Sequence, residues 1–145
     1  MKKTVLIVDD SEIDRYIATR FIEKSGLFDH VYSLNDGEEA YDHFKNEEES
    51  KKEKGDFFPP TIVFLDINMP RMNGFEFLEK LNQLPTAAKH KILFVTMLTS
   101  SEDQVEKQAA MNFPFVETFL TKPFKKEYVK LLAEKVDQKR KERNE

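Results

Sequence analysis

Charged side chains follow three separate hydrophobic runs of this chain: Asp9 with Asp10, Asp66, and Lys122. Short runs of aliphatic and β-branched residues are typical of buried parallel strands. In an open parallel sheet, the ligand site lies at the carboxyl ends of the strands, where the strand order reverses. If these three runs form neighbouring strands, three carboxylates and one ammonium group meet at one place.

Such a group of carboxylates predicts a divalent metal ion. Two unit charges about 4 Å apart repel each other by about 4 kcal/mol at an effective dielectric constant of about 20, so three neighbouring carboxylates need a cation. A few oxygen ligands on rigid strand ends, with room left for water, suit Mg²⁺. The sequence has no EF-hand spacing for calcium and no His–Cys cluster for zinc. We expect surface or structural roles for His30, His43 and His90.

Lys122 and Thr96 supply the other groups that a phosphoryl-transfer site needs. Lys122 is a flexible ammonium that can pair with phosphate, and Thr96 offers a hydroxyl at the end of the hydrophobic run at 91–96. Positioning and charge stabilisation do most of the catalysis in phosphoryl transfer. Asp66 is the best candidate to accept the phosphoryl group as an acyl phosphate, because it is the lone acid at the end of a central strand. Each residue alone has an ordinary explanation as a helix cap, a turn or a structural threonine, so the prediction rests on their combination.

The elements that must position these groups alternate between strands and helices, which is the pattern of a βαβ sheet. We expect strands at 4–8, 30–34, 61–65, 91–96 and 115–121.

The sequence also predicts a loop, a C-terminal tail and the buried face of the first helix. The run 46–56 contains no apolar residue, so we expect a solvated loop. We expect one domain at 1–136 and a charged tail at 137–145 that frays into solvent. In the first helix, which a capping box at 11–14 begins, the four-residue spacing of Ile13, Ile17 and Phe21 predicts the face that packs on the core.

The composition of the chain excludes several classes of protein. Its 145 residues, 34% charged and 39% hydrophobic, fit one ordinary globular domain. A net charge of −4 argues against nucleic-acid binding by electrostatics alone, and no apolar run is long enough to span a membrane. The chain has no cysteine and no signal-peptide core, so we expect a cytoplasmic protein that associates with neither nucleic acid nor membrane.

Four segments together resemble the receiver domain of two-component response regulators, of the stand-alone chemotaxis-regulator type. They read VLIVDDS at 5–11, VFLDINMPRMNG at 63–74, ILFVT at 92–96 and FLTKPF at 119–124. The resemblance covers about residues 3–136. It implies a doubly wound (βα)5 flavodoxin-like α/β fold, a three-layer sandwich with five parallel strands in the order 2-1-3-4-5.

The resemblance also assigns roles to the converging residues. It implies that Asp66 is the phosphoacceptor, that Asp10 binds Mg²⁺ directly, and that Asp9 acts partly through water. Asn68, two residues after Asp66, would bind the metal through its backbone carbonyl. These four residues form the expected metal site, with Mg²⁺ as the expected cofactor.

Three further residues have implied roles in catalysis and switching. Thr96 would be the switch hydroxyl that turns toward the phosphoryl group, and Lys122 would pair with it. Phe119 occupies the aromatic switch position, three residues before the lysine. If the fourth strand runs longer than expected, Thr99 could take the hydroxyl role; we favour Thr96 because it directly follows the apolar run.

Two residues depart from the pattern of the family. Met97 stands where relatives usually have a small residue, and Leu98 stands where some have a polar residue that orients water. Both changes would hinder hydrolysis at Asp66, so they predict a fairly long-lived acyl phosphate.

The expected function is therefore a phosphorelay signalling switch rather than a turnover enzyme, with only self-phosphorylation and autodephosphorylation. The expected donor is a sensor histidine kinase or a histidine phosphotransfer protein, and the output is binding to a protein partner. A phosphatase of the haloacid-dehalogenase kind is a second possibility, but it needs an acid where this chain has Asn68. A third possibility is a receiver-like module that binds partners without being phosphorylated.

Overall fold

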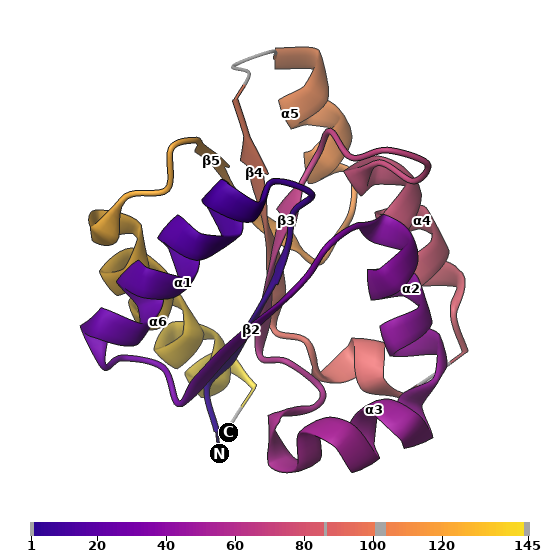
Figure 1. Ribbon diagram of the computed structural model, residues 1–145, viewed down its shortest axis with the longest axis horizontal. Coiled ribbons are helices and arrows are strands. Elements are labelled where there is room, and N and C mark those ends of the chain that lie inside the picture. The colour runs from indigo at the N-terminus through magenta and orange to yellow at the C-terminus, as the bar shows by residue number, and fades with distance from the viewer. Residues whose placement is uncertain (1, 86, 101–103, 144–145) are drawn as a thin grey trace.

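A five-stranded parallel sheet forms the centre of the molecule. The computed structural model describes residues 2–85, 87–100 and 104–143. The strands lie in the order β2-β1-β3-β4-β5, which confirms the predicted doubly wound α/β fold (Figure 1). Their bounds are β1 Thr4–Val8, β2 His30–Leu34, β3 Ile62–Asp66, β4 Phe94–Thr99 and β5 Val116–Thr121.

Helices cover both faces of this sheet. Helices α1 and α6 lie on one face, and α2, α4 and α5 lie on the other (Figure 1). The bounds of the α-helices are α1 Glu12–Ser25, α2 Gly37–Lys45, α3 Glu47–Lys54, α4 Gly74–Gln83, α5 Gln104–Met111 and α6 Lys126–Glu142. Two 3₁₀ turns, η1 Gly55–Phe57 and η2 Ala88–Lys91, lie before β3 and β4. In the described part of the chain, no helix has the length and apolar character needed to cross a membrane.

The central strands are buried on both faces, which explains their uninterrupted hydrophobic sequences. Every residue of β1 and of β3 is buried. Successive side chains point to opposite faces of a strand, so Val5 and Ile7 join the core under α1 and α6. Leu6 and Val8 join the core under α2 and α4. The sheet is therefore a rigid support for whatever follows the ends of β1 and β3.

The charged segment that we expected to be a loop is mostly helical. Helix α3 has glutamates in its first turn and lysines in its last turn, which is the arrangement that the helix dipole favours. The hydroxyl of Ser50, which is buried, donates to the backbone oxygen of His43 at 2.6 Å and lies 3.1 Å from its Nδ1. The Nε2 of His43 lies 2.7 Å from the hydroxyl of Tyr32 on β2. The prediction missed this helix because its contacts with the rest of the protein are polar.

The charged segment at the C-terminal end is also helical, where we expected it to fray. Helix α6 continues to Glu142. Lys3 pairs with Asp137 at 2.8 Å, and Lys139 pairs with Glu117 on β5 at 3.0 Å. Residues 137–142 thus continue the helix and form ion pairs with Lys3 and with Glu117 on β5.

The buried face of α1 differs from the predicted face by part of a turn. Ile13 is 71% exposed, whereas Ala18 and Ile22 are buried. A spacing of four residues turns about 40° beyond a full turn of helix, so the predicted stripe rotates away from the core toward its ends. Ile17 and Phe21 are partly buried at the edge of the core.

Candidate functional site

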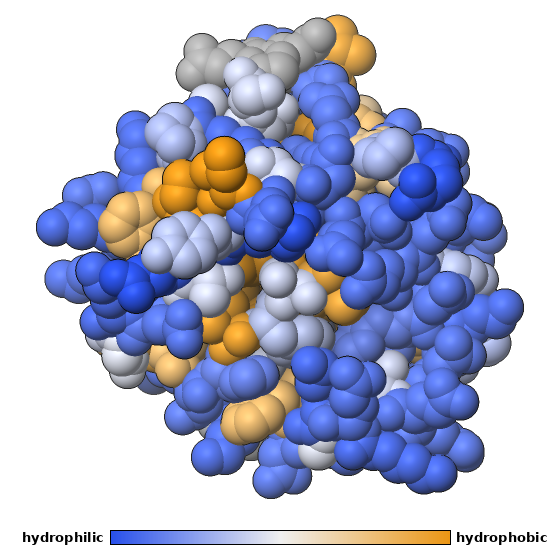
Figure 2. All heavy atoms as spheres, in the orientation of Figure 1, coloured by the Kyte–Doolittle hydropathy of each residue, from blue (hydrophilic) through white to orange (hydrophobic). Residues whose placement is uncertain are grey.

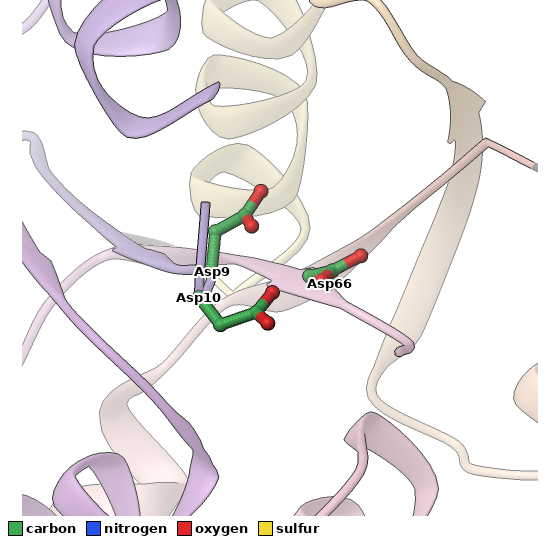
Figure 3. Close-up of side chains that lie close together, drawn as sticks. All are labelled: Asp9, Asp10 and Asp66. Carbon is green, nitrogen blue, oxygen red and sulfur yellow. The ribbon is translucent and has the colours of Figure 1, made fainter. Parts of the chain in front are cut away.

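Three carboxylates meet at the carboxyl end of the sheet, as the sequence predicts. Asp9 and Asp10 directly follow β1, and Asp66 is the last residue of the neighbouring strand β3. One oxygen from each lies within 4.8 Å of the others, and Figure 3 shows the three side chains leaving adjacent strand ends. Asp9 is 1% exposed and Asp66 is 5% exposed, while Asp10 faces solvent.

Lys122 places its ammonium group among these acids from the end of β5. Its Nζ lies 2.8 Å from Oδ2 of Asp9 and 3.3 Å from Oδ1 of Asp66. It also lies 3.0 Å from Oδ2 of Asp14, in the first turn of α1. The sequence reasoning missed Asp14, although a helix that begins at the end of β1 must carry its first turn past this site.

Local hydrogen bonds hold Asp9 in position. The backbone N–H of Ser11 donates to Oδ1 of Asp9 at 2.9 Å. Nη1 of Arg15 donates to the backbone oxygen of Asp9 at 2.7 Å. Ser11 also caps α1, because its hydroxyl accepts from the N–H of Asp14 at 3.2 Å. The capping residues that begin the helix therefore orient two of the acids that contact Lys122.

The loop after Asp66 returns tightly to the end of β3. The N–H of Gly74 donates to the backbone oxygen of Ile67 at 2.8 Å. A Cβ on Gly74 would lie 2.7 Å from the backbone oxygen of Asp66, so a larger residue would push the loop after β3 away. Asn68 lies in this loop and is exposed. Its role as a metal ligand through the backbone carbonyl stays a prediction.

Burial makes Asp66 unusually basic when no metal is bound. Burial, with the nearby charge of Asp9, raises the pKa of Asp66 to about 7, although Lys122 opposes this shift. Burial alone would lower the pKa of Lys122, but its hydrogen bonds to Asp9 and Asp14 and the charge of Asp66 raise it above its usual value. One ammonium thus compensates only part of the charge of four carboxylates. The remaining negative charge and the hard oxygen donors fit Mg²⁺.

The structure corrects the position that we assigned to Thr96. We expected the fourth strand to end there, but β4 continues to Thr99. Thr96 lies inside the strand, and its hydroxyl accepts from the hydroxyl of Thr118 on β5 at 3.0 Å. Thr99 is the last residue of β4 and is buried, and its backbone oxygen accepts from the N–H of Lys122 at 2.7 Å. The strand runs on because Met97 and Leu98 continue its hydrophobic sequence.

The same correction removes the reason for predicting a long-lived acyl phosphate. Met97 and Leu98 are buried strand residues, and they pack in the cores on opposite faces of the sheet. Neither lies in the loop after β4, where a side chain could hinder the approach of water to Asp66.

Phe119 lies on β5, which β4 separates from the strand that carries Asp66. It pairs with Met97 in the register of the sheet and packs, partly buried, against the core under α4 and α5. The Nζ of Lys107 on α5 lies 5.5 Å from the centre of its ring. Its ring thus lies between the sheet and α5. A rotation of this ring would change its packing against α5.

Comparison with known proteins accounts for this arrangement. Residues 5–134 match the family model of the response regulator receiver domain. The chain belongs to the response regulator receiver family. This confirms the predicted resemblance and makes the protein part of two-component signalling.

Individual proteins with receiver domains also resemble this chain in sequence. The chain is 30% identical over 125 residues to the alkaline phosphatase synthesis transcriptional regulatory protein PhoP of Bacillus subtilis, covering 86% of this chain and 44% of that protein. It therefore spans less than half the length of that relative.

Solved receiver structures match over nearly the whole chain. A two-component response regulator from Cytophaga hutchinsonii has a TM-score of 0.78 and 27% identity, covering 94% of this chain and 98% of that one. A structure of the CheX–CheY–BeF3–Mg²⁺ complex from Borrelia burgdorferi has a TM-score of 0.71 and 27% identity, covering 92% of this chain and 88% of that one.

Proposed function

We propose that the protein is a phosphorylation switch in which Asp66 accepts a phosphoryl group from the phosphohistidine of a sensor kinase or a phosphotransfer protein. The position of Asp66 carries this proposal. It is nearly buried beside two other carboxylates, and the Nζ of Lys122 is 3.3 Å away. Asp66 shares this single ammonium with Asp9 and Asp14, so one cation faces three carboxylates. The arrangement suits a metal ion and a transferred phosphoryl group.

In the proposed transfer, a carboxylate oxygen of Asp66 attacks the phosphorus atom. The other ring nitrogen of the phosphohistidine carries a proton, so when the phosphorus–nitrogen bond breaks and its electrons stay on the nitrogen, a neutral imidazole leaves. A magnesium ion held by Asp9, Asp10, Asp66 and the backbone carbonyl of Asn68 would offset the charge of the phosphoryl group. Lys122 would move from the carboxylates to a phosphoryl oxygen, because its side chain is a flexible point charge.

We assign the switch hydroxyl to Thr99 in place of Thr96. Thr99 ends β4, one residue beyond the partner of Asp66 in the register of β3 and β4, whereas the hydroxyl of Thr96 is engaged by Thr118 inside the sheet. The backbone of Thr99 is also joined to that of Lys122. A movement of Thr99 toward the phosphoryl group would therefore affect the start of the loop that carries Lys122.

The output surface in this proposal is formed by α5, β5 and α6 around Phe119. Val105 and Met111 on α5 are 74% and 52% exposed. Added charge at Asp66 would bias the positions of Thr99 and Phe119, and so the packing of α5. A protein partner that recognises one of the two states would read this change.

The donor protein would approach over α1. Ile13 and Tyr16 are 71% and 63% exposed, in the half of the helix that begins beside the acids. Figure 2 shows hydrophobic side chains gathered over this half of α1. An apolar surface next to the acceptor suits a helical donor that must bring its histidine to Asp66.

Intact mass after incubation with acetyl phosphate and Mg²⁺ tests the proposal. We expect wild type to gain the mass of one phosphoryl group and Asp66→Asn to gain none. Unmodified wild type would instead support a receiver-like module that acts without phosphorylation. Steady release of phosphate from a monoester would support a phosphatase, although Asn68 cannot serve as the general acid.

Two threonine variants form a matched pair that tests the revised assignment. We expect Thr99→Ala to be phosphorylated but to lose the change in partner binding or in the environment of Phe119. Thr96→Ala should keep both, because it removes only a hydrogen bond to Thr118. The reverse result would return the switch role to Thr96.

A further inference from the structure

A second charged region lies at the other end of the sheet, away from Asp66. A cleft of about 540 Å³ opens there between Lys2 near the N-terminus, the segment that leads into β3, the turn η2, and the end of α6. Within the described residues, its lining includes five cationic side chains and one carboxylate, Asp56; the cations are Lys2, Lys51, Lys91, Arg140 and Arg143. The cleft is therefore strongly positive in a chain whose net charge is −4.

Backbone carbonyls help to position three of these cations. Nη2 of Arg140 donates to the oxygen of Lys2 at 2.6 Å, and Nη1 of Arg143 donates to the oxygen of His90 at 3.4 Å. The Nζ of Lys51 donates to the oxygen of Phe58 at 3.2 Å. A carbonyl fixes the direction of a cation without cancelling its charge. Guanidinium and ammonium groups also have several donors each, so Lys51 and Arg143 can bind a further acceptor.

The floor of the cleft is rigid and partly apolar. Phe58 and Leu93 line it and are buried in the protein. Thr61, which also lines it, donates its hydroxyl to the oxygen of Lys2 at 3.1 Å and accepts from the N–H of Thr4 at 2.9 Å. These bonds join the start of β1 to the start of β3. The positive groups thus surround a preformed surface with room for more than a free phosphate ion.

The charged segment at 46–56 contributes directly to this cleft. It supplies Lys51 from α3 and Asp56 from η1. The hydrogen bond between Ser50 and His43 holds this helix against α2. The proposed phosphoryl-transfer site does not include α3, so the proposed function does not account for the side chains that this segment places at the cleft.

We propose that this cleft binds a small molecule with a diphosphate group and a larger organic body, such as a nucleoside diphosphate. Cations from four separate segments suit an anion with several oxygens, because each segment can reach a different oxygen. The volume lies in the range of small-molecule sites, and Phe58, Pro59 and Leu93 offer apolar contact to the organic part. This site is independent of phosphorylation at Asp66, which lies at the opposite ends of the same strands.

Calorimetric titration with ADP in low-salt buffer containing EDTA tests the proposal. EDTA removes metal that could bridge ADP to the carboxylates around Asp66. We expect binding at a 1:1 ratio with a Kd below about 1 mM. The double variant Lys91→Gln/Arg143→Gln should weaken binding at least about ten-fold, since it removes two charged donors from exposed positions.

The matched control is Lys126→Gln/Lys130→Gln, which removes the same charge from exposed positions of α6 outside the cleft. It should bind ADP within about two-fold of wild type, and so should Asp66→Asn. Equal weakening by both double variants would show attraction to net charge only and would overturn the proposal, as would no binding to wild type. Pyrophosphate binding as tightly as ADP would overturn the role of the organic body. Circular dichroism confirms that each variant is folded.

Discussion

The two ends of the central sheet carry opposite charge and differ in burial. At the carboxyl end, the ammonium of Lys122 contacts three carboxylates, those of Asp9, Asp14 and Asp66, and Asp9 and Asp66 are nearly inaccessible to solvent. At the amino end, the lysines and Arg143 of the cleft are exposed. Charges in a buried site interact strongly, whereas water and salt screen exposed ones. Substitution should therefore change stability at the first end and mainly ligand binding at the second.

The largest effect is expected from Lys122→Ala. This change leaves Asp9 and Asp66 buried without their cation, which should lower the free energy of unfolding by about 3 kcal/mol in EDTA. Urea denaturation measures the loss. Adding Mg²⁺ should stabilise the variant more than wild type, because the ion replaces the missing charge. Lys126→Ala, at an exposed position of α6, is the control, and an equally small effect of both changes would contradict the coupling described for the acid site.

The second prediction concerns the pH dependence that Asp66 imposes. Its pKa in the folded protein is about 7, above the ordinary value of 3.8, so the folded state binds more protons between these values. Stability contributed by Asp66 is then present at low pH and is lost as the pH rises toward 7. In EDTA, we expect the stability of Asp66→Asn relative to wild type to grow by roughly 3 kcal/mol from pH 5 to pH 8. A difference that stays constant across this range would contradict the prediction, and saturating Mg²⁺ should abolish the growth.

The third prediction has the opposite sign and comes from the contact that holds α3. Burial and the charge of Lys54 lower the pKa of His43 to about 4, from an ordinary value of 6.5. The unfolded state binds more protons between these values, so this contribution to stability is lost as the pH falls. We expect wild type to lose roughly 2 kcal/mol more than His43→Gln between pH 7 and pH 5. If the free energies of unfolding of the two proteins changed with pH in parallel, protonation of His43 would not destabilise the folded state.

The acid site could be predicted well from the sequence because Asp9, Asp66 and Lys122 each directly follow or end a hydrophobic run. The strands at 4–8 and 30–34 have the predicted bounds, and Asp9 and Asp66 stand at the ends of uninterrupted hydrophobic runs. Lys122 was placed in the same way. Wherever the hydrophobic run ended at a charge, the prediction of position was correct.

Where the hydrophobic run had no sharp end, the prediction failed. Thr96 was taken as a strand end, but Met97 and Leu98 continue the strand to Thr99. A threonine is common inside strands, so its type could not mark the boundary. Asp14 and helix α3 were missed for another reason. Asp14 contacts Lys122, which is 108 residues away in the chain, and α3 is held by a polar contact between Ser50 and His43. Neither polar contact produces a periodic pattern in the sequence.

The smallest effect is expected from Asp14→Asn, which tests how the charge of Lys122 is compensated. Asp14 is the most exposed partner of Lys122 among Asp9, Asp14 and Asp66, with 34% of its side chain accessible. Exposed ion pairs contribute less than about 1 kcal/mol, so urea denaturation should show a loss below that value. Glu12→Gln removes the same charge from the same turn of α1 without touching Lys122, and it should cost a few tenths of a kcal/mol, about the effect of a charge near the helix dipole. If Asp14→Asn cost as much as Lys122→Ala, Asp14 would hold the ammonium in place of the buried acids, and the contrast between a buried acidic end and an exposed basic end would no longer explain the stability of the site.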